Sequence, residues 1–242
     1  MSKKTIVWLV IGAFLVILGS IIFACVMMTL KWNFLKLSTA KYETNTYEFT
    51  EKVEDISIKT DTADVVFVPS SDSKIHVTCY EADNQKHTVT LSDGALVVEV
   101  VDTRKWYEYI GINFSAPKIT VSLPAGEYGE LEVEVSTGRV KLDGVRCEKF
   151  ASKGSTGDIS MKDVIAKESI FVERGTGNIT IDGTDAAELY LKTTTGQVKG
   201  SVLTDKVFIA RTDTGRISVP NGTTGGRCEI ITDTGNINVK IK

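Results

Sequence analysis

The sequence predicts an all-β protein: a parallel β-solenoid with Thr-Gly rungs of about 19 residues, preceded by one N-terminal transmembrane helix. Three observations predict this fold. A run of 25 uncharged residues begins at Ile6. The dipeptide Thr-Gly then recurs six times at a nearly constant interval, and apolar residues alternate with polar ones on both sides of it. Alternation is typical of half-buried β-strands, and a fixed period of about 20 residues indicates a repeat architecture.

The uncharged run from Ile6 to Leu30 lies between Lys4 and Lys31. A helix of this length is about 37 Å long, whereas the hydrocarbon core of a bilayer is about 30 Å thick. The helix can therefore span a bilayer with some tilt. Tryptophan at positions 8 and 32 stands near the two ends, where amphipathic rings favour the membrane interface. We expect residues 6–30 to contact the lipid bilayer as an uncleaved anchor.

Processing of this segment has two alternatives. The sequence from Ile22 to Cys25 resembles a bacterial lipoprotein processing site, although Val26 continues the apolar run beyond the cysteine. A cleaved signal peptide is the other alternative, but its apolar region is usually only about 7–15 residues long.

The orientation of the chain follows from its long C-terminal part, because long domains translocate largely regardless of loop charge. We therefore expect residues 1–5 to be a cytoplasmic tip and residues 31–242 to be extracytoplasmic.

The Thr-Gly dipeptides set the register of the repeat. Successive glycines are 19 or 20 residues apart, and a β-branched residue stands two positions after each one. Each unit is therefore a strand, a tight corner and a second strand. Glycine suits the corner because it adopts positive φ without a Cβ clash. Units stacked about 4.8 Å apart would share one continuous core. The predicted structural corners are Gly138, Gly157, Gly177, Gly196, Gly215 and Gly235.

Upstream segments are less regular. Residues 126–242 are expected to form six rungs, and residues 53–125 an irregular β segment that begins and caps the solenoid. A degenerate seventh copy of the repeat fits residues 56–67, with Ala63 in place of the corner glycine. Residues 31–52, rich in Thr, Lys and Asn, are expected to be a juxtamembrane stalk. The aromatic segment Trp106–Ile110 is interpreted as a cap, with an exposed contact as the alternative.

Catalytic, cofactor and metal sites are not predicted. Asp213 and Asp233 each precede Thr-Gly, as in aspartic proteases, but the repeat places both at a small polar turn position. A calcium site near these two carboxylates is the alternative left open. His76 and His87 have no ligand-type residue at a metal-site spacing and are expected to face solvent. The net charge of −3 argues against a nucleic-acid partner.

Two outward-facing rows of the repeat bear on partners. Four residues before each glycine, the charge alternates in sign over the first four rungs. Six residues before it lies an apolar stripe, and large exposed apolar patches mark interaction sites unless another segment covers them. The predicted interaction stripe is Phe171, Tyr190 and Ile209. The C-terminal rung, residues 236–242, is expected to present a free edge for self-association, guarded only by Lys240 and Lys242.

The apolar helix, the segment 36–48 and the Thr-Gly-x-Ile/Val repeats resemble a bacterial β-strand-repeat family that carries the label "putative adhesin" and has a domain of unknown function. The resemblance implies a membrane-tethered, extracytoplasmic β-solenoid of the cell envelope and brings no catalytic residues. The expected function is a surface interaction, adhesin-like or structural module that contacts an unknown protein, a wall polymer or its own copies. An envelope-stress sensor or regulator is the alternative, and an enzyme is a remote one.

Overall fold

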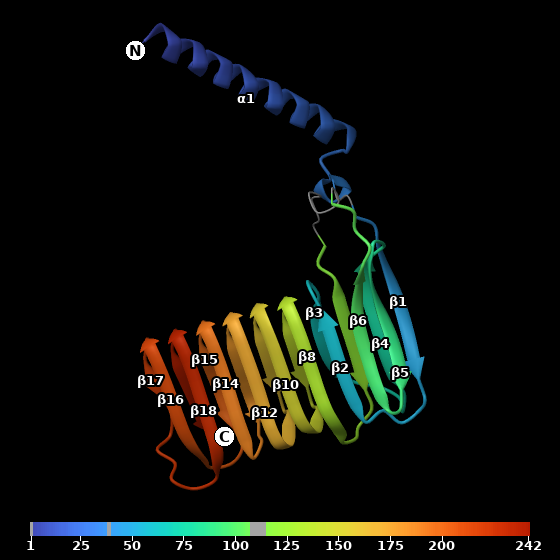
Figure 1. Cartoon of the computed structure of the whole chain (residues 1–242), viewed down its shortest axis with the longest axis vertical. Coiled ribbons are helices and arrows are strands. Elements are labelled where there is room, and N and C mark those ends of the chain that lie inside the picture. The colour runs from blue at the N-terminus through green and yellow to red at the C-terminus, as the bar shows by residue number, and fades with distance from the viewer. Residues whose placement is uncertain (1, 38–39, 107–114) are drawn as a thin grey trace. The chain divides into compact units, whose positions relative to one another are not determined.

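The structure, a computed structural model, describes residues 2–37, 40–106 and 115–242 and is nearly all β (Figure 1). It divides into two compact units, one of residues 1–41 with 105–115 and one of residues 42–104 with 116–242. The predicted class, an all-β solenoid preceded by one apolar helix, is confirmed. Most of the aromatic segment expected to be a cap, residues 107–110, lies outside the described residues.

The first unit contains the apolar helix α1 (Lys3–Thr29) and the short 3-10 helix η1 (Phe34–Leu37). Ser2 caps α1 by accepting a hydrogen bond from the Thr5 amide. The helix ends at Thr29. After Leu30 the next two residues, Lys31 and Trp32, adopt left-handed backbone conformations with φ of 52° and 57°. Among the described residues α1 alone is long and apolar enough to cross a membrane, a test that a signal sequence also passes.

The second unit is a coil in which each turn gives one strand to each of two facing sheets. Sheet I holds, in spatial order, β5 (Gln85–Ser92), β6 (Ala95–Asp102), β2 (Asp55–Thr60), β8 (Tyr128–Thr137), β10 (Arg146–Thr156), β12 (Ile165–Thr176), β14 (Glu188–Thr195), β18 (Gly226–Thr234) and β16 (Lys206–Thr214). Sheet II holds β1 (Tyr42–Phe49), β4 (Ile75–Ala82), β7 (Lys118–Leu123), β3 (Asp64–Pro69), β9 (Val140–Asp143), β11 (Ile159–Lys162), β13 (Ile179–Thr184), β15 (Val198–Val202), β19 (Ile237–Ile241) and β17 (Ile217–Ser218). Pairing is parallel except at the end formed by β1, β4 and β5.

The regular coil begins before residue 126. β2, Ala63 and β3 stack in register on β8, Gly138 and β9, so that Ile56 lies opposite Leu131. β6 and β7 form a further coil on β2 and β3. Residues 53–125 are therefore largely solenoid, and the true cap is the antiparallel end strands. One of these, β1, lies inside the expected stalk of residues 31–52.

The order of the last two coils in space differs from their order along the chain. β18 pairs with β14 on one side and with β16 on the other, and β19 lies between β15 and β17 in the same way. The final coil of the sequence is thus inserted between its two predecessors. β17 is only two residues long, and Pro220 follows shortly after it. Since proline cannot donate to a β-ladder, such a coil suits the end of a stack.

The expectation that residues 236–242 present the free end of the solenoid is therefore wrong. Lys242 instead donates its amide to Val202 O and lies 3.3 Å from an Asp182 carboxylate oxygen through its Nζ. The edge strands at this end are β16 and β17. The inward-row residue Ile217 is exposed here, unlike the inward residues of the other coils, and the outward-facing Val207 and Ile209 are exposed as well.

Inward-facing side chains of the two sheets form one continuous core. Its rows consist mostly of β-branched and other aliphatic residues, nearly all of them completely buried. Burying one such side chain stabilises the fold by roughly 1.5–3 kcal/mol. No single coil can enclose its own row, so this stabilisation arises between coils.

The Thr-Gly corners stack as closely as the strands. At each corner glycine an added Cβ would lie 1.8–2.2 Å from the carbonyl oxygen of the neighbouring corner. The amide of Gly196, for example, donates to Thr234 O at 2.9 Å. The corners therefore need glycine for the close approach of two backbones, in addition to its tolerance of the φ of +131° seen at Gly157.

Replacing Gly196 by alanine should destabilise the second unit by a few kcal/mol, because the new Cβ would be 2.0 Å from Gly177 O. The expected readout is a clear fall in melting temperature, followed by circular dichroism. Gly126→Ala is the matched control, since the nearest atom to its added Cβ is 4.0 Å away. Equal melting temperatures for the two variants would contradict this account of the corners.

Candidate functional site

The outer face of sheet I carries a long row of alternating charge. The pairing of β6, β2, β8, β10, β12 and β14 places one charged residue of each strand beside the next. In spatial order they are Glu99, Lys59, Glu134, Lys153, Glu173 and Lys192. Lys192 Nζ lies 2.8 Å from Glu173 Oε1. Exposed pairs of this kind contribute under ~1 kcal/mol each, so the row favours correct register more than stability.

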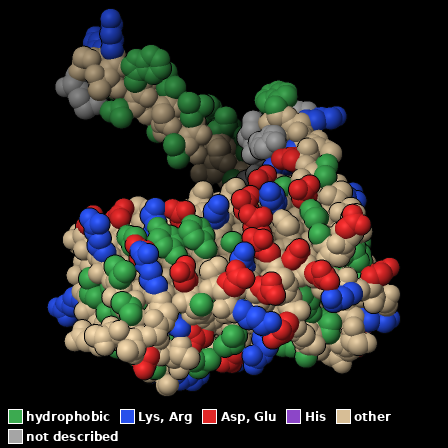
Figure 2. Space-filling model, turned by 60° about the horizontal axis from the view of Figure 1, so that its bottom comes forward, with side chains coloured by type: hydrophobic (Ala, Val, Ile, Leu, Met, Phe, Trp, Pro, Cys, Tyr) green, Lys and Arg blue, Asp and Glu red, His purple; other side chains and the backbone are tan. Residues whose placement is uncertain are grey.

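An open depression of about 560 Å³ follows this row. Its lining includes Lys59, Glu99, Glu134, Lys153 and Glu173. Figure 2 shows acidic and basic side chains interspersed on the visible face, with hydrophobic side chains between them. The depression therefore offers both signs of charge together with hydrogen-bonding groups, which suits a polar ligand or a polar protein surface.

Phe171 and Tyr190 form a stacked aromatic pair on the same face. Their ring centroids are 4.9 Å apart with planes 8° from parallel, and Lys153 Nζ lies 5.8 Å from the Phe171 centroid. A second depression of about 280 Å³ lies at this pair and is also lined by Arg227 and Glu229. The pair is half-buried, so both rings remain within reach of a ligand.

The predicted stripe is shorter than expected. Tyr190 is paired with Glu229, and Glu229 with Ile209, so a carboxylate separates Ile209 from the aromatic pair. The inserted position of β18 is the physical reason. The contiguous apolar surface is Phe171 and Tyr190, and Ile209 belongs to the exposed end coil.

A buried arginine lies behind this face. Arg174 is 1% exposed, and its Nη2 donates to Ser152 Oγ at 2.8 Å. Its Nε and Nη1 have no hydrogen-bond partner among the described residues. Burial lowers the pKa of the guanidinium to about 10. Gly154 leaves room for it, because an added Cβ there would be 2.3 Å from Arg174 Nη1.

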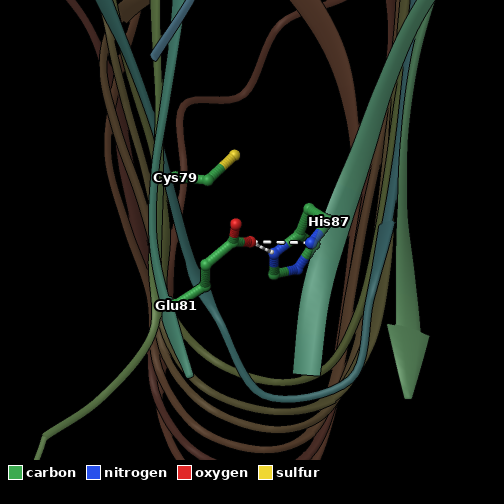
Figure 3. A group of neighbouring side chains, drawn as sticks. All are labelled: Cys79, Glu81 and His87. Atoms are coloured by element: carbon green, nitrogen blue, oxygen red, sulfur yellow. Dashed lines mark hydrogen bonds and ion pairs between the residues drawn. The ribbon is translucent and has the colours of Figure 1, made fainter. Parts of the chain in front are cut away.

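A second polar cluster is buried near the hairpin between β4 and β5. Cys79 and Glu81 project from β4 toward His87 on β5 (Figure 3). His87 Nδ1 and its backbone amide lie 2.8 and 2.7 Å from Glu81 Oε2, and its Nε2 lies 2.9 Å from Thr60 Oγ1. Asn45 Nδ2 donates to the other Glu81 oxygen at 2.8 Å. Burial, assisted by Glu81, raises the pKa of the Cys79 thiol to about 12.

This cluster corrects the expectation for one histidine. His87 is 4% exposed and lies beside Cys79 and Glu81, whereas it was expected to face solvent without such neighbours. The hairpin is the reason, since it brings position 87 opposite positions 79 and 81. The sequence did contain a signal for the burial of His87. In an alternating strand Gln85, His87 and Val89 share one face, and that face is the inward one. His76 is partly exposed and lies 3.0 Å from Asp72.

The remaining sequence candidates show no built site. Asp213 and Asp233 lie on the neighbouring strands β16 and β18, and both are exposed. Two cysteines outside this set of candidates, Cys147 and Cys228, are free and buried, and burial raises the pKa of each thiol to about 12. These two thiols therefore behave as core residues.

Comparison with known proteins decides the family. The model of the Toastrack DUF4097 family matches residues 53–242. The chain belongs to this family. The matched Toastrack region begins just before β2, which agrees with a solenoid that starts well upstream of residue 126.

Solved structures support the same fold for this Toastrack protein. A putative cell adhesion protein from Clostridium sporogenes is similar with a TM-score of 0.52 and 11% identity, over 84% of this chain and 100% of that chain. A putative adhesin from Bacteroides fragilis is similar with a TM-score of 0.50 and 17% identity, over 81% and 97%. At such identities the likeness shows the fold alone. No curated protein matches the chain.

Arg174→Met should raise the free energy of unfolding by about 1–3 kcal/mol. It removes a buried charge that has no carboxylate partner in the described part of the chain, while filling a similar volume. The measurement is the midpoint of urea unfolding. Arg211→Met, which changes an exposed arginine, should leave the midpoint nearly unchanged. A lower midpoint for Arg174→Met would mean that the two unpartnered nitrogens, Nε and Nη1, are bonded by water or an anion.

Proposed function

We propose that this protein is a membrane-tethered, extracytoplasmic β-solenoid that acts as an adhesin-like interaction module of the bacterial cell envelope. The Toastrack family and the adhesin-labelled structural neighbours support a surface module. Helix α1 supports tethering, because its length and composition suit a membrane span. The partner is an unidentified protein or a wall polymer.

The observation that carries this proposal is the Phe171–Tyr190 pair on the outer face of sheet I. Aromatic residues are enriched where proteins bind partners, because they combine a large apolar surface with few rotatable bonds. Here the pair lines one depression, and Lys153 of the other depression lies 5.8 Å from the Phe171 ring. The charged groups of both depressions would orient a polar partner. The charged row would limit non-specific association through its mixed signs.

A reporter enzyme that is active only outside the cytoplasm, fused after Lys242, should be active. The same reporter placed before Met1 should be inactive, because the expected cytoplasmic tip precedes α1. Enzyme activity in intact cells is the measurement. The reverse pattern would overturn the extracytoplasmic location and the surface role with it.

The double variant Phe171→Ala/Tyr190→Ala should bind isolated cell walls roughly 10- to 30-fold more weakly than the wild-type chain, through loss of two aromatic contacts of about 1 kcal/mol each. Co-sedimentation of the detergent-solubilised protein with walls measures this. Tyr80→Ala is the matched control, since Tyr80 belongs to a comparable ring pair with Tyr42 on sheet II. Protease treatment of the walls distinguishes a polymer from a protein partner. Equal binding by wild type and the double variant would refute this surface.

A further inference from the structure

The inward side chains of β4 and β5 bring three different metal-ligand types to one point. One sulfur of Cys79, one oxygen of Glu81 and one nitrogen of His87 all lie within 4.8 Å of one another. In a tetrahedral zinc site, ligand atoms are about 3.3–3.8 Å apart. The closest pair, Glu81 Oε2 and His87 Nδ1 at 2.8 Å, would separate by about half an ångström.

The surrounding contacts resemble the outer support of a metal site. Thr60 Oγ1 lies 2.9 Å from His87 Nε2, which leaves Nδ1 directed at the centre of the cluster. Glu81 is held by the His87 amide and by Asn45 Nδ2. Metal-binding histidines usually engage their second ring nitrogen in this way, and ligating carboxylates are themselves hydrogen-bonded.

Charge also favours a divalent cation. Glu81 is completely buried, and the residues it contacts here are a histidine and an asparagine. A thiolate, a carboxylate and a neutral imidazole together carry two negative charges, which one Zn²⁺ would cancel. Sulfur and imidazole ligands favour zinc over the hard cations calcium and magnesium.

We propose that Cys79, Glu81 and His87 bind one Zn²⁺ ion, with a water molecule in the fourth position. The ion joins β4 of sheet II to β5 of sheet I at the antiparallel end of the solenoid. It therefore acts as a clip that holds the two sheets together where no further coil covers them. Its role is structural, and it needs no contact with the partner that binds the outer face.

The test uses the full chain in detergent, stripped with a chelator and titrated with Zn²⁺ against a chromophoric competitor. The expected result is one tightly bound ion per chain and a melting temperature that rises with zinc. Co²⁺ should give a thiolate-to-metal charge-transfer band. Cys79→Ser should weaken zinc binding at least 100-fold and abolish that band.

Cys147→Ser is the matched control, because Cys147 is an equally buried thiol outside the cluster. It should bind zinc like the wild-type chain. Absence of stoichiometric zinc on the wild-type chain overturns the proposal, and so does wild-type affinity in Cys79→Ser. Should Cys79→Ser fail to fold, the wild-type cobalt spectrum decides, since a missing thiolate band excludes Cys79 as a ligand.

Discussion

The close stacking of one coil on the next is the constraint on which the rest of the structure depends. Each corner glycine packs against the carbonyl of its neighbour so tightly that a single Cβ would collide with it. This contact fixes the register of the strands on both sides. Register in turn keeps apolar rows inside, since a slip of one residue would turn every side chain to the opposite face. The core and the outer charged row follow from that one backbone contact.

Much of the fold could be predicted because the repeat is a property of local sequence. The corner glycines and the inward rows were readable from position alone, and so was the coil at Ala63. The coil of β6 and β7 was not, because the sequence between these two strands contains no Thr-Gly dipeptide. The order of the last two coils was also unreadable. Both coils carry the same inward pattern. Which of them packs against β14 and β15 therefore depends on differences such as the short β17 beside Pro220.

The candidate sites were likewise predictable only in part. Phe171 and Tyr190 were predictable, since their strands are neighbours both in the sequence repeat and in space. Ile209 was misplaced because Glu229 intervenes when β18 is inserted. Lys59 and Glu99 extend the charged row only once the order of the early strands is known. His87 lies beside Cys79 and Glu81 because a hairpin brings β5 opposite β4. The spacing of residues in the sequence does not show how close the side chains of two facing strands lie.

The inverted order of the final coils has a consequence for how the chain acquires its structure. A segment emerging from a translocation channel or a ribosome presents β16 and β17 before β18 and β19. A solenoid that grew strictly by adding each new coil to the last would trap β16 on β14 and leave no place for β18. The end of the stack must therefore stay open, or reopen, until both coils are present. Addition of one coil after another therefore cannot build this end of the solenoid. The same holds at the opposite end, where β7 lies between β4 and β3 although it follows both in the chain.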